Sequence, residues 1–221
     1  MIAGNTFDYP YVHGQALAAA GKGFVSASAG AVKSGHVKLK DFDIIDLILG
    51  KQKESTVGTG NIGWHFKSIP EKLQKELRSF VHKGGDLLVS GQYVASDLTS
   101  DRASQADRDF AAQVLGVAPA EPVRIRNPRI ALSPESGMQN RSFTYNNTLG
   151  RDMYIVENPD MLIPIGEAQM FMDFDDNGQG AAVARKEGRS HTITMSVPFE
   201  AIKNPADRVE LMKTILNYFR K

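Results

Sequence analysis

A small set of polar side chains gives this sequence its candidate chemistry. Asp8, His13, Ser90, Gln92 and Glu200 each lie just beyond a predicted strand. An acid, an imidazole and a hydroxyl at one sheet edge are the groups that proton transfer to a bound substrate needs. Because the carboxyl ends of parallel strands share one edge, we expect these five side chains to line one concavity. His13, Glu200 and Ser90 are the candidate catalytic residues, with His13 or Glu200 as general acid or base.

Aromatic residues near these positions support a second hypothesis. Tyr9, Tyr11 and Tyr93 offer rings on which a sugar could stack. The full set of candidate substrate-binding residues is Asp8, Tyr9, Tyr11, Gln92, Tyr93 and Asp97. A domain that binds a sugar on these rings and catalyses no reaction would be a binding or structural module. The sequence therefore leaves two classes open, an enzyme and a non-catalytic module.

Nucleophilic catalysis has little support. The chain has no cysteine, so it can supply no thiolate nucleophile, thiolate metal site or disulfide. Ser90 lacks the glycine two residues before it that the sharp strand-to-helix turn of serine hydrolases requires. Its alternative role is to cap the following helix.

The sequence predicts neither a metal nor a cofactor. Asp173 to Gly178 fits the first six positions of a calcium loop, but the twelfth position is Ala184 instead of a bidentate glutamate. Strand patterns on both sides predict a hairpin turn there. The histidines do not occur four residues apart with a glutamate, so a helical zinc site is not expected. No glycine-rich nucleotide-binding motif follows a strand.

The candidate residues depend on a helix and strand unit between Ser68 and Asp97. Ser68 and Glu71 have the spacing of a capping box, and apolar residues then recur at helical spacing up to Val81. Gly84 and Gly85 stop this helix, and the apolar run Leu87 to Val89 predicts a strand covered on both faces.

Other elements follow from similar patterns. The run 44–49 predicts a buried strand, and the order of a strand at 24–28, a short helix and this strand favours parallel pairing of the two strands; residues 6–14 are predicted to form a loop. Residues 24–28 are predicted to form a strand, and residues 51–67 a glycine-rich loop. Residues 169–197 contain two turn signals and predict an antiparallel meander, and Asn204-Pro205 opens a final amphipathic helix. We therefore expect a three-layer α/β domain with a mainly parallel sheet and an antiparallel C-terminal extension.

Composition limits the partners. With 221 residues, 42% of them hydrophobic, the chain can form one main domain over 1–221. Its net charge of +1 gives no overall attraction to nucleic acid, and it contains no apolar run of the roughly 20 residues that cross a bilayer. Residues 1–5 lack the features of a signal peptide, so the chain is expected to be either cytoplasmic or a piece of a longer secreted protein.

Particular motifs resemble a known superfamily. The helix ending in Val-x-x-Gly-Gly, the strand Asp86 to Gly91 and the closing Val197-Pro-Phe-Glu200 are similar to class I glutamine amidotransferase-like domains, which are flavodoxin-like. Residues 2–11, 46–52 and 90–98 more closely resemble a domain of secreted Bacteroidetes-type proteins labelled xanthan lyase, often found beside a golvesin-like module.

This resemblance implies a domain, cut from a longer exported protein, that acts on a polysaccharide or the cell envelope. It implies a periplasmic or extracellular location, a carbohydrate or envelope polymer as partner, and contacts with other domains of the parent chain. Glu200 occupies a place comparable to the superfamily's acid, but glutamine hydrolysis is ruled out because the cysteine is missing. The expected function is a hydrolase or lyase on a glycan, and the alternative is a non-catalytic carbohydrate-binding or structural module.

Overall fold

The computed structural model describes residues 9–57, 64–150 and 153–221. In this part of the chain the helical elements are α1 (Tyr9–Ala19), α2 (Ala29–Lys33), η1 (Leu39–Asp41), α3 (Glu71–His82), α4 (Ser96–Thr99), α5 (Gln105–Phe110), the π-helical turn η3 (Ala111–Leu115), η4 (Pro134–Ser136), η5 (Phe199–Ala201) and α6 (Pro205–Tyr218). The strands are β1 (Ile44–Gly50), β2 (Ser55–Val57), β3 (Trp64–Phe66), β4 (Asp86–Gly91), β5 (Val117–Pro119), β6 (Arg129–Leu132), β7 (Ser142–Thr144), β8 (Leu162–Pro164), β9 (Gln169–Phe174), β10 (Gly180–Glu187) and β11 (Ser190–Met195).

The predicted helix and strand unit is confirmed as α3 and β4. Leu73, Leu77 and Phe80 face inward along α3, because their spacing places them on one side of the helix. The chain leaves α3 through Gly84, whose φ of +95° suits glycine. The capping box is wrong, since Pro70 occupies the N-cap position without a side-chain hydrogen bond.

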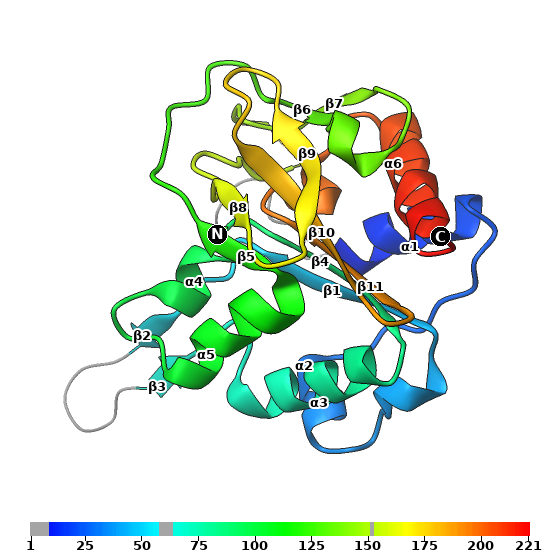
Figure 1. Cartoon of the computed structure of the whole chain (residues 1–221), viewed down its shortest axis with the longest axis vertical. Coiled ribbons are helices and arrows are strands. Elements are labelled where there is room, and N and C mark those ends of the chain that lie inside the picture. Colours follow the sequence, from blue (N-terminus) through cyan, green and yellow to red (C-terminus); the bar gives the residue numbers. More distant parts are fainter. Residues whose placement is uncertain (1–8, 58–63, 151–152) are drawn as a thin grey trace.

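The main sheet is mixed. Its strand order is β1-β4-β11-β10-β9-β6-β7, and β5 and β8 join it through β10. The pairs β1–β4 and β4–β11 are parallel, whereas the described pairs from β11 outward through β10, β9, β6 and β7 are antiparallel. Figure 1 shows that β9 and β10 run at an angle to β1 and β4, so the strand direction changes across the sheet.

The predicted three-layer, mainly parallel, flavodoxin-like sheet is therefore wrong. The structure has a strongly curled mixed sheet in which antiparallel strands make up the larger part. The physical reason is the connections: β9, β10 and β11 follow each other through tight turns, which allow only antiparallel pairing. The antiparallel segment that we expected as an extension is the middle of the sheet, because β11 pairs directly with β4.

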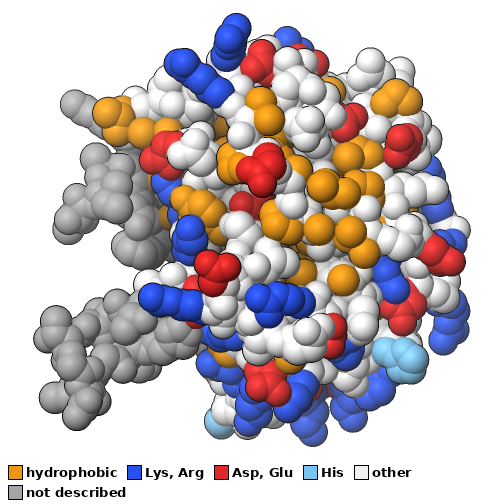
Figure 2. All heavy atoms as spheres, turned by 60° about the vertical axis from the view of Figure 1, so that its left-hand side comes forward, with side chains coloured by type: hydrophobic (Ala, Val, Ile, Leu, Met, Phe, Trp, Pro, Cys, Tyr) orange, Lys and Arg blue, Asp and Glu red, His pale blue; other side chains and the backbone are white. Residues whose placement is uncertain are grey.

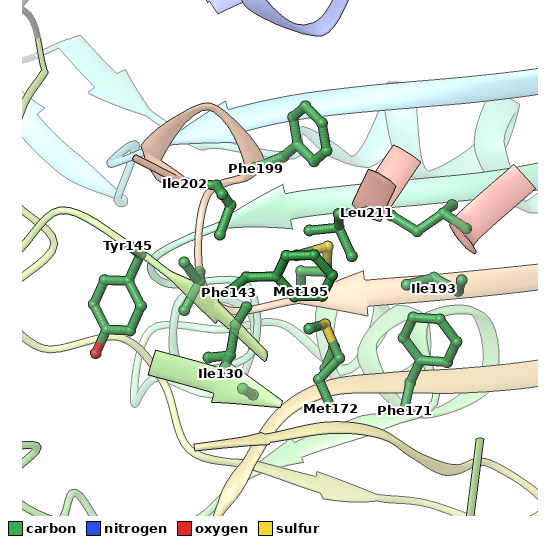
Figure 3. Packing of buried hydrophobic residues seen from close by; sticks show 14 of the residues in the cluster. Ile130, Phe143, Tyr145, Phe171, Met172, Ile193, Met195, Phe199, Ile202 and Leu211 are labelled. Atoms are coloured by element: carbon green, nitrogen blue, oxygen red, sulfur yellow. The ribbon is translucent and has the colours of Figure 1, made fainter. Parts of the chain in front are cut away.

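Helices cover both faces of the sheet at its parallel end. One face packs under α1 and α6, where Leu88, Ile193 and Leu211 belong to one buried cluster. Figure 3 shows this cluster, with Phe199 of η5 and Ile202, the residue after η5, along its upper side. The other face packs against α3 and η3, where Leu87 and Val89 are buried. Strand alternation explains the division, since Leu88 points away from its two neighbours.

Three local predictions are also wrong. Residues 9–19 form the helix α1 where we expected a loop up to residue 14, residues 24–28 form no strand, and β2 and β3 pair within the segment expected to be a loop. The turn at 175–178 joins β9 to β10 as a hairpin turn, as expected. Among the described residues, none of the helices has the length and apolar character that crossing a membrane demands.

Candidate functional site

His13 lies between two carboxylates in the interior of the protein. Its Nδ1 donates a hydrogen bond to Asp46 Oδ2 at 2.6 Å, and its Nε2 donates to Glu200 Oε2 at 3.2 Å. Tyr154 donates its hydroxyl hydrogen to the other Glu200 oxygen, Oε1, at 2.8 Å. We call these four residues, His13, Asp46, Tyr154 and Glu200, the His13 cluster.

Each member of the cluster comes from a different part of the chain. His13 is on α1, Asp46 is in the middle of β1, Glu200 is in η5 and Tyr154 is in the segment after β7. Asp46 points toward α1 because side chains alternate along β1, so Asp46 faces the same side as Leu88, its partner in β4. The cluster therefore ties α1 and η5 to the parallel end of the sheet.

The environment of His13 keeps its imidazole charged. Burial lowers the pKa of the ring, but the charges and hydrogen bonds of Asp46 and Glu200 outweigh burial and raise the pKa from 6.5 to about 10. Burial and the Glu200 carboxylate also raise the pKa of Tyr154 well above its ordinary value. At neutral pH the cluster thus contains an imidazolium that donates from both nitrogens and a neutral tyrosine.

The cluster is largely closed to solvent, and Asp46 is its one partly buried member. His13 is 1% exposed and Glu200 3%, and the ring of Phe199 lies against the imidazole with a centroid distance of 4.7 Å. Gly50 allows this close packing: a Cβ there would lie 3.3 Å from Glu200 Oε1, and its φ is +56°. No nitrogen of His13 is left to exchange a proton with a substrate, because both are bonded to carboxylates.

Ser90 lies on the same face of the sheet as Asp46 but forms no part of these hydrogen bonds. It pairs with Ile48 of β1, is fully buried, and its hydroxyl has no hydrogen-bond partner among the described residues. A buried serine of this kind cannot attack a substrate from solvent. Nor does its hydroxyl cap a helix, since α4 has Ala95 at its N-cap position.

Gln92 and Tyr93 lie in a separate polar group beyond the end of β4. The Gln92 amide donates to the Tyr93 hydroxyl at 2.9 Å and to the backbone oxygen of Asn158 at 3.4 Å. Lys53 places its ammonium group 5.0 Å from the centre of the Tyr93 ring. Burial raises the pKa of Tyr93, and the nearby acids Glu157 and Asp160 add to this.

The chain itself occupies the strand ends where we expected a ligand. The segment 154–160 crosses there: Lys51 donates to the backbone oxygen of Ile155 at 2.9 Å and pairs with Glu157, and the Asp160 amide donates to the backbone oxygen of Gln92 at 3.0 Å. In open α/β sheets this crevice is the usual ligand site. Here Lys51, Asp160 and the Gln92 backbone bond within the protein, whereas Gln92 Oε1 and the Ser90 hydroxyl have no hydrogen-bond partner among the described residues.

The remaining candidates do not share one surface. Asp97 accepts hydrogen bonds from the Ser68 hydroxyl and the backbone amide of Glu54, which makes it a support for local structure. Tyr9 packs edge-on against Tyr154 with ring centroids 5.3 Å apart, whereas Tyr11 is 63% exposed on α1. Asp8 lies outside the described residues.

The structure joins His13 to Glu200, whereas the Ser90 hydroxyl makes no hydrogen bond to them and Gln92 and Asp97 bond to other groups. Sequence reasoning missed Asp46 and Tyr154. Asp46 did leave a signal, since it is the one charged residue in the apolar run 44–49, where an acid needs a partner. Tyr154 left none, because it lies in an irregular segment.

No family model matches this sequence, and no curated protein matches it. Among solved structures, the chain is similar to the cold-adapted β-galactosidase from Rahnella sp. R3, with a TM-score of 0.59, 12% identity and coverage of 98% of this chain and 27% of that one. It is also similar to the exo-β-1,4-mannosidase Op5Man5 from Opitutaceae bacterium strain TAV5, with a TM-score of 0.52, 16% identity and coverage of 98% and 30%. A third similar structure is the cytoplasmic protein STM3548 from Salmonella typhimurium, with a TM-score of 0.57, 13% identity and coverage of 93% and 85%.

At these identities the likeness concerns the fold. The chain spans less than a third of the two glycosidase chains, so the fold corresponds to one part of each. The expected membership of the flavodoxin-like amidotransferase superfamily, and with it the xanthan lyase resemblance, is wrong. The fold is a curled mixed sheet, and it is similar to parts of β-galactosidases and to a cytoplasmic protein.

Proposed function

We propose that this chain is a non-catalytic accessory domain of a glycan-directed, hydrolase-like protein. The observation that carries the proposal is the His13 cluster, in which the two residues predicted to act as general acid and base, His13 and Glu200, bond to each other. Glycoside hydrolysis uses two carboxyl groups on opposite sides of the sugar bond, with substrate or water between them. In this protein the imidazole of His13 fills the space between Asp46 and Glu200.

The link to glycans rests on the fold. Chains with β-galactosidase and mannosidase activity contain a part with this architecture. In this chain the segment 154–160 covers the strand ends, where a reaction would need an open site. Such a domain is suited to support or target a neighbouring catalytic domain. The second candidate, an enzyme that uses Glu200 and His13, would require the cluster to open.

The test combines turnover and binding. The purified chain and its Glu200→Gln variant are assayed with aryl β-galactosides and aryl β-mannosides, and on an array of neutral and acidic glycans. Glu167→Gln, a change at an exposed carboxylate, is the matched control. We expect no turnover by any of the three proteins and glycan binding by all of them. Turnover that Glu200→Gln abolishes and Glu167→Gln retains would establish an enzyme.

A further inference from the structure

A hollow lined by lysines lies at the amino ends of β1 and β4, away from the His13 cluster. It has a volume of about 750 Å³ and is formed by α2, the segment through η1, and α3 with the glycines that follow it. Its basic lining residues are Lys33, Lys38, Lys40, Lys72 and Lys83. We call this feature the lysine hollow.

The charge in the lysine hollow is unbalanced. Five ammonium groups face three carboxylates, and one of these, Asp86, already accepts hydrogen bonds from the backbone and ring of His191. Within the described part of the chain none of the five lysines forms an ion pair or a side-chain hydrogen bond. The whole chain carries only +1, so positive charge has been concentrated here.

The surface view agrees with this concentration. Figure 2 shows Lys and Arg side chains gathered at the lower end of the molecule, which is where α2 and α3 lie in Figure 1. A group of like charges without counter-charges raises the local concentration of an anionic partner.

The lining residues indicate which kind of anion fits. Arginine, which binds a single phosphate or carboxylate through two hydrogen bonds, is absent from the described lining, so recognition by spaced point charges is favoured. Binding of single-stranded nucleic acid uses exposed aromatic rings for base stacking. In the described lining, Phe80 is 5% exposed and Phe42 is partly buried. Exposed Ser34 and Ser79 offer hydroxyls that suit sugar hydroxyl groups.

We propose that the lysine hollow binds an acidic polysaccharide, a chain of sugars with carboxylates at regular intervals. This inference rests on the proposed function and specifies the class of glycan. The carboxylates pair with the ammonium groups of α2, η1 and α3, and the sugar hydroxyls bond to the serines and to the backbone around Gly84.

Isothermal titration with polygalacturonate oligomers tests the inference. The parent chain is compared with the variant Lys38→Gln, Lys72→Gln, Lys83→Gln and with a matched control, Lys186→Gln, Lys203→Gln, Lys213→Gln, whose lysines are exposed and do not line the hollow. Both triple variants lose three charges. Exposed substitutions change stability little, so both should fold.

We expect the hollow variant to bind about tenfold more weakly than the parent, because it loses three exposed charge pairs with the ligand. The affinity of the control variant should stay within about twofold of the parent's. Binding by the parent should weaken strongly between about 0.05 M and 0.5 M salt, since salt screens exposed charges. Absence of binding, equal weakening in both variants, or tighter binding of poly(U) RNA would each overturn the inference.

The outcomes also separate this inference from the proposed function. Binding of neutral galactan without binding of polygalacturonate would overturn the acidic-polysaccharide site and leave a glycan-directed domain. Absence of binding to any glycan would overturn both. Turnover that depends on Glu200 would overturn the non-catalytic role alone, because the hollow is separate from the His13 cluster.

Discussion

Replacing His13 with alanine should destabilise the protein strongly at neutral pH. The change leaves Asp46 and Glu200 buried without the imidazolium that lies between them. Removing one partner of a buried ion pair typically costs about 3–5 kcal/mol. A rise of the His13 pKa from 6.5 to about 10 corresponds to a stabilisation of roughly 5 kcal/mol, which agrees with that range.

The sign of the pH dependence follows from the raised pKa. The folded protein holds the His13 proton more tightly than the unfolded chain does, so the stabilisation is fully present below pH 6.5 and is lost as the pH rises toward 10. Between these values the free energy of unfolding should fall by at most about 1.4 kcal/mol per pH unit from this group. Titrating groups outside the His13 cluster are common to the parent and the variant, whereas Asp46 and Glu200 lose their partner in the variant, so the difference between the two reports the His13 cluster as a whole.

Urea denaturation followed by circular dichroism measures the difference in free energy of unfolding between the parent and His13→Ala. Measurements at pH 6.5, 8 and 9.5 span the range between the pKa of His13 in the unfolded chain and its raised pKa in the folded protein. At the lowest pH we expect the free energy of unfolding of His13→Ala to be about 3–5 kcal/mol below that of the parent, and we expect this difference to narrow as the pH rises. The control variant His36→Ala, at an exposed histidine, should have the stability of the parent at each pH. A direct check is an NMR titration of the His13 ring in the parent. A midpoint near 6.5, or a His13→Ala variant as stable as the parent at every pH, would refute the reasoning.

Two further predictions concern packing. Leu88→Ala should lower the free energy of unfolding by about 2–5 kcal/mol, because Leu88 is 1% exposed under α1 and α6. The control is Ile163→Ala, at a position that is 45% exposed. An equal loss of stability in both variants would argue against the packing of β4. Gly180→Ala should lower stability by about 1–3 kcal/mol in the same denaturation assay, because a Cβ there would lie 2.2 Å from the Leu162 backbone oxygen. Gly150→Ala, where a Cβ would have nothing within 4 Å, should cost far less, and a neutral Gly180→Ala would mean that β8 and β10 can separate.

Much of the local structure could be predicted from the sequence. The helix α3 and the strand β4 follow from apolar spacing and from the two glycines between them, and α6 follows from Asn204 as N-cap with Pro205 after it. The turns between β9, β10 and β11 are encoded by short polar segments that include Gly178 and Gly188. These signals involve neighbours in the sequence, so they need no knowledge of distant contacts.

Long-range contacts decided the rest. Residues 9–14 lack a helical pattern, yet they form the start of α1, where His13 is held by Asp46 and Glu200, 33 and 187 positions away. The strand order depends on β11 pairing with β4, a choice that local hairpin signals cannot express. Tyr154 joins the cluster only because the segment 154–160 crosses the strand ends. Such contacts form when the whole sheet buries its apolar faces, and a histidine becomes a buried cation only in that assembled environment.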